Sequence, residues 1–459
     1  MQSLRLASFS LLLASSLVLT TPAAAQTSDD LFDPTVLHDI QLTMKPGDWE
    51  TLQAKFLDDA YYPADMQWRE VVIPQVGVRS RGSGSRNARK PGLKIDFGRY
   101  VDDQTAFGLK SIVLANGIQD PSMLAQRIGL GMFAKMEMPA SRVVHARVFI
   151  NREYVGLYQV IEPVDKTFLA RVFGKDANGK TENGGYLYEY HWKSDYPWDY
   201  LGPDLEIYAE LFEPKTHESD APVPLYGPLE TLFRRLNESS DTQFEREVGE
   251  LLDLRQFVRH IAVENFIAEN DGFLGHWGPN NFYLYRFQGR DLSQLLPWDK
   301  DHALWARDYD ILQGVNDNIL ARRVLSIPAY LRLYLQTLSD CADAAMRPES
   351  EGSSIGWLEA EMRRITEQIK DAAHADRNTR FDNDRYDEET GKVLRFARER
   401  GPFVAREARR ALEHMDLMLA QMSWTGVSSR LLPRYISFDF SQDGDGLRRS
   451  SLSAHGMWW

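Results

Sequence analysis

Hydrophobic and polar positions in the N-terminal half of the chain alternate with the period of β-strands. This alternation predicts strands over 36–44, 71–78, 93–97, 109–114, 142–150, 154–162 and 186–190. Helices are predicted between them over 46–56, 122–136 and 165–171, and Ser122 is expected to cap the second helix. Asn151 and Arg152 lie between two predicted strands and are expected to form the turn of a hairpin. Residues 191–224 have no clear period and are expected to be irregular.

The C-terminal half instead repeats its apolar positions with the helical period. Helices are predicted over 228–237, 242–252, 253–267, 329–346, 357–373 and 388–422. Asp253 is expected to cap the third of these, and Gly401-Pro402 to interrupt the last. Two short strands, FYLYRF from Phe282 and LLPW from Leu295, follow the helix at 253–267. The two patterns together predict an α+β fold.

The chain begins with the features of a secretory signal peptide. Arg5 supplies a positive start, 6–19 is an apolar run, and Ala23-Ala24-Ala25 offers a small-residue cleavage site. We therefore expect export to a periplasmic, cell-surface or extracellular location, and no later stretch is long and apolar enough to predict a stable membrane span.

Along the whole chain we expect five regions. They are a signal peptide at 1–25, a flexible lead-in at 26–34, a main domain at 35–346, a helical region at 347–424 and a disordered tail at 425–459.

Net charge and cysteine content argue against two classes of protein, general nucleic-acid-binding proteins and disulfide-stabilised scaffolds. The formal net charge is −13, which argues against general nucleic-acid binding, because that requires a basic surface. The single cysteine, Cys341, cannot form an intramolecular disulfide, so stability must come from a buried core.

The most informative stretch runs from residue 264 to 305. Asp271 follows a predicted helix, Asn281 opens a strand, and Asp299 follows the next strand. Mg²⁺ prefers oxygen ligands and shares them with phosphates, so Asn281 and Asp299 at one side of a hairpin suit a metal–nucleotide site. A third carboxylate nearby could orient a hydroxyl group for attack.

A second candidate region is the Gly/Ser loop at 79–90, between two predicted strands. Backbone N–H groups of such a loop can approach phosphate oxygens, and Arg79, Arg81, Arg86 and Lys90 supply positive charge. Lys94 alternates with Leu93 and Ile95 on the returning strand, and it therefore faces away from their side. The loop contains no P-loop motif.

Four linked motifs in one order, over about 36–346, resemble the spore coat protein H (CotH) family of atypical kinases. They are Arg79-x-Arg81-Gly82-x-x-Ser85-Arg86 with the strand that carries Lys94, Asn116 to Asp120, Phe149 to Tyr158 followed by Glu162, and Asp271…Asn281…Pro297-Trp-Asp299-Lys-Asp301. The resemblance implies an atypical protein-kinase-like fold with a β-rich N-lobe, a helical C-lobe and ATP between them, here with extra C-terminal helices.

The resemblance also implies roles for individual residues. Asp271 would be the catalytic carboxylate, and Asn281 and Asp299 would hold Mg²⁺. ATP would contact Arg81, Gly82, Ser83, Ser85, Lys94 and Glu162. Of these, Lys94 would also assist catalysis, and Glu162 would lie at or near the inter-lobe connection. The activity implied is transfer of a phosphoryl group to Ser or Thr hydroxyls of a protein substrate.

Several alternatives stay open on the sequence. Asp271 and Asn281 are ten residues apart, where an ordinary kinase has a spacing of five, so Asn280 competes with Asn281. Asp301 competes with Asp299 as a metal ligand, and no Glu lies within 122–136 to pair with Lys94. The alternative function is a non-catalytic surface, coat-assembly or adhesion protein; a metal-dependent hydrolase is less favoured because the ten histidines are scattered.

Overall fold

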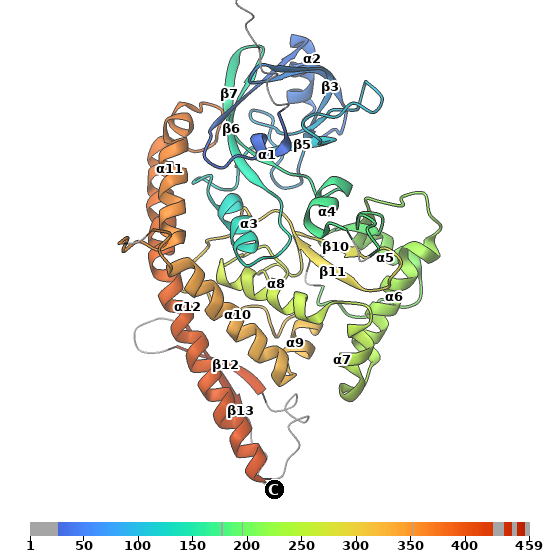
Figure 1. Ribbon diagram of the computed structural model, residues 1–459, viewed down its shortest axis with the longest axis vertical. Coiled ribbons are helices and arrows are strands. Elements are labelled where there is room, and N and C mark those ends of the chain that lie inside the picture. Colours follow the sequence, from blue (N-terminus) through green and yellow to red (C-terminus); the bar gives the residue numbers. More distant parts are fainter. Residues whose placement is uncertain are drawn as a thin grey trace, which may run out of the picture.

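A computed structural model describes residues 26–175, 178–194, 196–350, 352–425, 436–442 and 448–454. For 421–425, 436–442 and 448–454 only the backbone is described. The predicted signal peptide at 1–25 lies outside the described residues. A β-rich part stands above a helical part, and the C-terminal helices run along one side of both (Figure 1).

The β-rich part is a closed barrel in the order β1-β2-β3-β4-β5-β7-β6. Neighbouring strands are antiparallel except β1 and β6, which are parallel. The bounds are β1 His38–Met44, β2 Tyr62–Trp68, β3 Val71–Arg81, β4 Gly92–Asp96, β5 Ser111–Ala115, β6 Val143–Ile150 and β7 Glu153–Ile161. Short helices α1 (Ser28–Leu31) and α2 (Pro46–Ala54) accompany it.

Apolar side chains of the strands fill the barrel, and β1 shows the strictest alternation of buried and exposed residues. In β1 every second residue is buried, so Ile40, Leu42 and Met44 enter the interior while Asp39, Gln41 and Thr43 stay exposed. These side chains join one hydrophobic core that is separate from the core of the helical part. The barrel is therefore a rigid wall that can present its loops to the rest of the chain.

The helical part surrounds a second sheet in the order β11-β10-β8-β9. Its strands are β8 Tyr186–Tyr190, β9 Phe212–Pro214, β10 Phe282–Arg286 and β11 Ser293–Pro297. Its helices are α3 Ala125–Lys135, α4 Lys166–Phe173, α5 Leu205–Leu211, α6 Pro222–Glu238, α7 Asp241–Gly249, α8 Leu254–Phe266, α9 Ile319–Leu325 and α10 Pro328–Met346.

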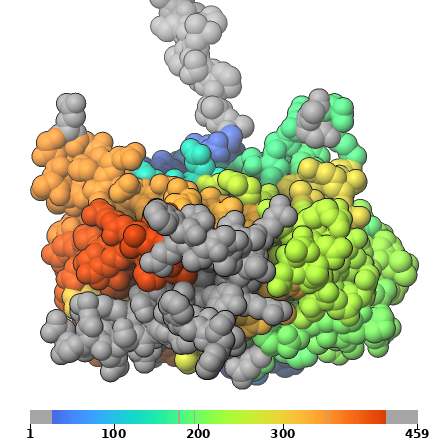
Figure 2. All heavy atoms as spheres, turned by 90° about the horizontal axis from the view of Figure 1, so that it is seen from below, coloured from blue at the N-terminus to red at the C-terminus, as the bar shows by residue number. Residues whose placement is uncertain are grey.

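Two long helices, α11 (Trp357–Ala375) and α12 (Asn383–Thr425), complete the fold. Both contact α10, and α11 also reaches β7 of the barrel. In Figure 2 the orange to red surface of the C-terminal helices lies on the opposite side from the yellow-green α6 and α7. β12 (Ile436–Gln442) and β13 (Arg448–Ala454) pair as an antiparallel hairpin within the predicted disordered tail; the rest of 426–459 lies outside the described residues.

The structure confirms the α+β class and most predicted elements. Asn151 and Arg152 both have positive φ, 50° and 72°, and they turn the hairpin between β6 and β7 as predicted. The Asp253 carboxylate accepts a hydrogen bond from Gln256 N at 3.0 Å and caps α8.

Other structural predictions were wrong. The lead-in at 26–34 contains α1, whose Leu31 is buried, and α6 begins at Pro222 rather than at Pro228. The sequence pattern missed β2, and it missed α5 and β9 within 191–224. α3 begins at Ala125, whose N–H is capped by the Asp120 carboxylate at 2.8 Å rather than by Ser122. α12 continues through Gly401-Pro402 without a break.

Candidate functional site

Helix α8 carries the chain to Asp271. Its buried side, which includes Phe257, Ile261 and Phe266, fixes the helix in the core of the helical part. Beyond the helix Ala268 has a φ of 52°, and Asp271 N donates to Glu269 Oε1 at 2.9 Å. The turn leaves the Asp271 side chain only half-buried, at a cleft.

The hairpin of β10 and β11 brings Asn281 and Asp299 to the same end of the sheet. Phe282 pairs with Pro297, and Trp298 N donates to Asn281 O at 3.1 Å. Asn281 and Asp299 have φ values of 58° and 44°. Asn and Asp are the non-glycine residues that best tolerate this left-handed backbone, so the residue types suit both positions.

Two asparagine amides hold the Asp271 carboxylate. Asn280 Nδ2 donates to Oδ1 at 3.0 Å, and Asn281 Nδ2 donates to Oδ2 at 2.9 Å. Asn281 Nδ2 also donates to the Asp271 carbonyl at 2.8 Å. Both candidate asparagines therefore contact Asp271, and the Asn281 amide oxygen is left as the atom that could bind an ion.

Asp299 and Asp301 also line the cleft, and they lack hydrogen-bond donors. Among the described residues no hydrogen bond to either carboxylate is formed; Asp301 has only His302 Nε2 at 4.0 Å. Burial raises the pKa of both groups. Arg81 opposes this effect at Asp299, whereas Asp299 adds to it at Asp301. Half-buried carboxylates without donors are suited to a hard cation.

Lys300, between these two aspartates, points the other way, into the core. Its Nζ donates to Glu264 Oε1 at 2.7 Å and to Asn281 O at 3.0 Å. Burial favours the neutral form of Glu264, but Lys300 and His260 outweigh it and lower the pKa of Glu264 to about 2. Glu264 Oε2 also accepts from Phe273 N at 2.8 Å, so this buried carboxylate joins α8, the Asp271 loop and the loop after β11.

The Gly/Ser loop forms the facing wall. Arg79 and Arg86 both contact Asp59, at 2.6 and 2.5 Å, and Arg86 Nε donates to Gly82 O at 2.7 Å, which closes the loop on itself. The guanidinium of Arg81 lies 5.7 Å from the centre of the Trp298 ring. The positive charge of the barrel therefore reaches the hairpin that carries Asp299.

Between these walls is a cleft of about 820 Å³, the size of a small-molecule site. Its lining includes the predicted residues Arg81, Gly82, Ser83, Ser85, Asp271, Asn281, Asp299 and Asp301. It also includes residues that sequence reasoning missed: Asp59, Gln119, Glu189, Trp192, Glu213, Lys215 and Trp277.

Contacts of three missed residues link separate segments that line the cleft or lie beside it. Gln119 Nε2 lies 3.1 Å from His302 Nε2 and links the barrel to the loop that follows β11. Trp192 Nε1 donates to Trp277 O at 2.9 Å, and both rings are about half-exposed. Trp277 stands in the Gly-rich loop before Asn280. An aromatic residue in such a loop was the sequence signal that could have identified it as a lining residue of the cleft.

The structure does not bring Lys94, Glu162 or Lys90 to this cleft. Lys94 pairs in register with Arg79 and Val113 on the barrel wall and is absent from the lining. Glu162 is buried and accepts from Arg142 and Arg171, each at 2.9 Å, so its charge is already paired. Lys90 Nζ lies 2.6 Å from Asp376 Oδ2. Its charge is therefore paired with Asp376 and, contrary to the prediction, is not directed at a phosphate bound by the Gly/Ser loop.

The protein groups alone do not form a complete metal cage. Within the described ranges no group of three or more His, Cys, Asp or Glu side chains is arranged to hold a metal ion. Mg²⁺ at nucleotide sites takes only one or two carboxylates and completes its shell with phosphate and water, so Asp299 with the Asn281 oxygen fits that donor set. In the described part of the chain no helix is both long and apolar enough to span a membrane.

Comparison with known proteins agrees with the motifs. The family described as "CotH kinase protein" matches residues 78–404, a region that includes α11 and part of α12. Inner spore coat protein H of Bacillus subtilis (strain 168) is 25% identical over 380 residues, which cover 79% of this chain and 95% of that protein. Invasin CotH7 of Rhizopus delemar is 22% identical over 303 residues, which cover 63% of this chain and 46% of that protein. The chain belongs to the CotH kinase protein family.

Proposed function

We propose that the protein is an exported atypical protein kinase that transfers the γ-phosphoryl group of ATP to Ser or Thr hydroxyls of an exported protein. The observation that carries this proposal is the cleft itself. The donor-free carboxylates of Asp299 and Asp301 and the amide-held carboxylate of Asp271 line one wall, and the cationic Gly/Ser loop lines the other. Phosphoryl transfer requires little more than such positioning and charge neutralisation.

The Gly/Ser loop would bind the phosphates. Gly82 has a φ of 114°, and a Cβ atom there would lie 2.5 Å from Ser85 Oγ, so only glycine allows this tight loop. The charge of Arg81 acts on Asp299, and its guanidinium lies over the neighbouring Trp298 ring, which suits a ligand that is bound to both Arg81 and Asp299. ATP would supply the phosphoryl group. Asp299 and the Asn281 oxygen would hold Mg²⁺, which would supply positive charge next to the phosphates.

Asp271 would orient the acceptor hydroxyl. The hydroxyl oxygen forms a bond to the γ-phosphorus while the bond from that phosphorus to the bridging oxygen of ADP breaks. The hydroxyl proton passes toward the Asp271 carboxylate. The amides of Asn280 and Asn281 fix the direction of that carboxylate, because each holds one of its oxygens.

We further propose that the barrel and the helical part correspond to the two lobes of a kinase-like fold. Their separate cores and the cleft between the Gly/Ser loop and the β10–β11 hairpin support this assignment. The apolar N-terminal segment supports export, and the names of the relatives, a spore coat protein and an invasin, support a location at or beyond the cell surface.

A phosphotransfer assay tests the proposal. The purified chain would be incubated with Mg²⁺, ATP labelled at the γ-phosphate, and a mixture of exported proteins from the source organism. We expect labelled phosphoserine or phosphothreonine with the wild-type chain and at least about a 100-fold loss with Asp271→Asn, which keeps the shape of the side chain but removes its charge. Equal labelling by the wild type and Asp271→Asn would contradict the assigned role.

The second candidate function is a non-catalytic role in coat assembly or adhesion. The names of the two relatives favour it, since one is called a spore coat protein and the other an invasin. Binding of ATP without any labelled product would support a kinase-like scaffold of this kind.

A further inference from the structure

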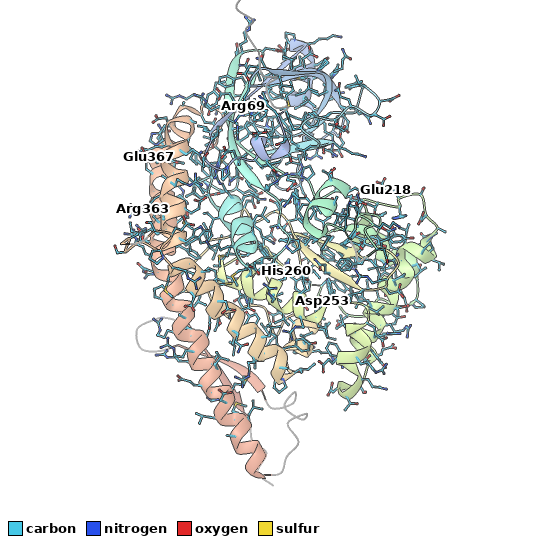
Figure 3. All side chains as sticks on the ribbon, in the orientation of Figure 1. Arg69, Glu218, Asp253, His260, Arg363 and Glu367 are labelled. Atoms are coloured by element: carbon cyan, nitrogen blue, oxygen red, sulfur yellow. The ribbon has the colours of Figure 1, made fainter. Side chains whose placement is uncertain are left out.

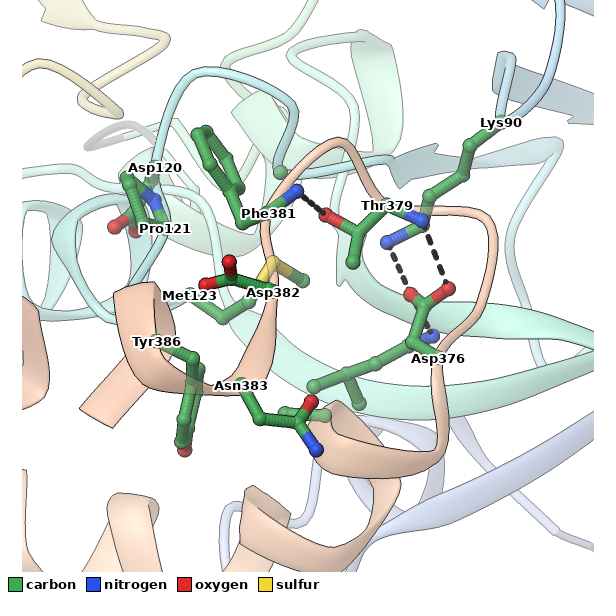
Figure 4. A pocket seen from close by; sticks show the side chains of 13 residues that line it. Lys90, Asp120, Pro121, Met123, Asp376, Thr379, Phe381, Asp382, Asn383 and Tyr386 are labelled. Atoms are coloured by element: carbon green, nitrogen blue, oxygen red, sulfur yellow. Dashed lines mark hydrogen bonds and ion pairs between the residues drawn. The ribbon is translucent and has the colours of Figure 1, made fainter.

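The connection between α11 and α12 contacts the barrel at a place that shares no lining residue with the cleft. Residues 376–382 pack there against the loop that carries Lys90 and against β7 (Figure 4). Asn378 Nδ2 donates to Val155 O at 3.0 Å, and Tyr154 Oη donates to Ala372 O at 2.8 Å. The C-terminal helices are thereby tied to the barrel as well as to α10.

The centre of this contact is an ion pair between Lys90 and Asp376. Lys90 Nζ lies 2.6 Å from Asp376 Oδ2, and each side chain is only 2% exposed. Leu157 N donates to the same carboxylate oxygen at 3.0 Å. Gly156 has a φ of 143°, and a Cβ atom there would lie 2.6 Å from Asp376 Oδ2, so the barrel leaves room for this carboxylate.

A buried ion pair of this kind contributes little net free energy to folding. Removing both charges from water costs several kcal/mol per ion, and apolar residues of similar size often serve as well. Burial lowers the pKa of Lys90, which reflects that cost. A buried pair fixes the position of its two chain segments, so the question is which group Lys90 positions.

Lys90 is the last residue of the Gly/Ser loop, and hydrogen bonds tie its backbone to the middle of the loop. Lys90 N donates to Asn87 Oδ1 at 2.9 Å. Asn116 Nδ2 donates both to Lys90 O at 2.8 Å and to Ser85 O at 2.9 Å. One buried amide therefore joins the residue that Asp376 holds to a residue of the cleft wall.

We propose that Asp376 is a positioning residue for the Gly/Ser loop: it fixes Lys90, and Lys90 fixes Ser85 through Asn116. The inference rests on the proposed function, since the loop is taken to bind nucleotide phosphates. It makes the α11–α12 connection a working part of the nucleotide site, which agrees with the family match that extends to residue 404.

The test compares the wild-type full chain with two variants, Asp376→Asn and Glu367→Gln. Asp376→Asn keeps the size of the side chain and removes the charge that pairs with Lys90. Glu367→Gln is the matched control, because Glu367 is exposed on the outer side of α11 (Figure 3) and the substitution removes one negative charge from the helix that leads to Asp376. Hydrogen exchange of residues 83–86 and the dissociation constant for Mg·ATP would be measured for each form.

We expect faster exchange of the loop amides and about tenfold weaker Mg·ATP binding in Asp376→Asn, with Glu367→Gln unchanged. Loop exchange and affinity within about twofold of the wild type would overturn the inference. A purely structural role predicts faster exchange across the barrel, including β1 and β2, rather than an effect concentrated at 83–86, and that pattern would also overturn it.

A second variant covers the case in which Asp376→Asn does not fold. Lys90→Met/Asp376→Asn buries no charge, so it should fold, and the same loop and affinity effects are expected. If the wild-type chain binds no ATP, the proposed function fails; the exchange measurement still decides whether Asp376 positions the loop.

Discussion

The side-chain amide of Asn281 donates to both the carboxylate and the main-chain carbonyl of Asp271, at 2.9 and 2.8 Å. One residue at the start of β10 thus fixes both the backbone and the side chain of the proposed catalytic residue. Asn280 contacts only the carboxylate, at 3.0 Å. The two neighbouring asparagines, which the sequence leaves as alternatives, therefore have unequal roles.

Substitution of the asparagines tests this difference. Asn281→Ala should lower phosphotransfer by about 100-fold or more, because it removes two hydrogen bonds and the proposed metal ligand. Asn280→Ala should cost only about tenfold, because one amide still holds Asp271. Steady-state rates at saturating ATP give the comparison; a larger loss in Asn280→Ala would exchange the two assignments.

The Asp299 carboxylate should lower the stability of the folded chain and should be necessary for Mg²⁺-dependent ATP binding. Its pKa is raised by burial and by Asp271, so the ionised carboxylate is disfavoured where it lies. Asp299→Asn should therefore abolish Mg²⁺-dependent ATP binding while raising stability by about 1 kcal/mol. Urea unfolding of Asp299→Asn beside Asp291→Asn, an exposed aspartate between β10 and β11, measures the effect. A loss of stability in Asp299→Asn would show that the carboxylate is well satisfied without metal.

The pair of Glu264 and Lys300 should contribute to folding. Both side chains are at most 1% exposed, and the pair joins α8 to the loop that carries Asp299. Glu264→Gln should destabilise the chain by about 3–5 kcal/mol, because it leaves the Lys300 ammonium buried without a counter-charge. The double variant Glu264→Gln/Lys300→Met should recover much of that loss in urea unfolding. Equal midpoints for the wild type and Glu264→Gln would contradict this account.

His145 should make stability depend on pH. Its Nε2 lies 2.7 Å from Met123 O and its Nδ1 lies 3.2 Å from Arg127 Nη1, so the neutral ring donates at Nε2 and accepts at Nδ1. Burial, assisted by Arg127, lowers the pKa of His145 from 6.5 to about 3. Because the unfolded chain binds the proton first, this contribution is complete above pH 6.5 and is lost as pH falls toward 3.

The size of that contribution is a few kcal/mol, since one pKa unit corresponds to about 1.4 kcal/mol. Unfolding midpoints in urea at pH 7 and pH 5 should differ less in His145→Gln than in the wild type. His414→Gln, which replaces an exposed histidine of α12, is the control and should keep the wild-type difference. An unchanged pH dependence in His145→Gln would refute the assignment.

The sequence predicts elements where local chemistry decides them. β8 has the bounds expected for 186–190. Asn151-Arg152 turns the β6–β7 hairpin as expected, and Asn151 is a residue type that tolerates the positive φ of such a turn. The order of Asp271, Asn281 and Asp299 predicts their shared cleft, because a helix end and a hairpin end can meet at one edge.

Elements decided by distant contacts could not be predicted in this way. Pro402 should break a helix, yet α12 continues. The buried Arg400 donates to Phe266 O and Tyr309 O, and Gly401 packs closely against Met346, so tertiary contacts hold this turn in place. Tertiary packing outweighs local preference here.

The ion-pair partners of charged residues could not be predicted from the sequence either. The sequence offers no signal that Lys90 meets Asp376, since the two lie on segments far apart in the chain. Glu162 was expected near the nucleotide, but Arg142 and Arg171 surround it in the fold. The motifs identified which segments carry chemistry, whereas the structure decides which charges reach the cleft.

Titration calorimetry of the full chain with ATP, in the presence and absence of Mg²⁺, is the most direct test of the central claim. The account predicts binding that depends on Mg²⁺ and is lost in Asp299→Ala but kept in Asp291→Ala. Absence of binding at millimolar ATP with Mg²⁺, or binding that Asp299→Ala leaves unchanged, would contradict a nucleotide site in this cleft.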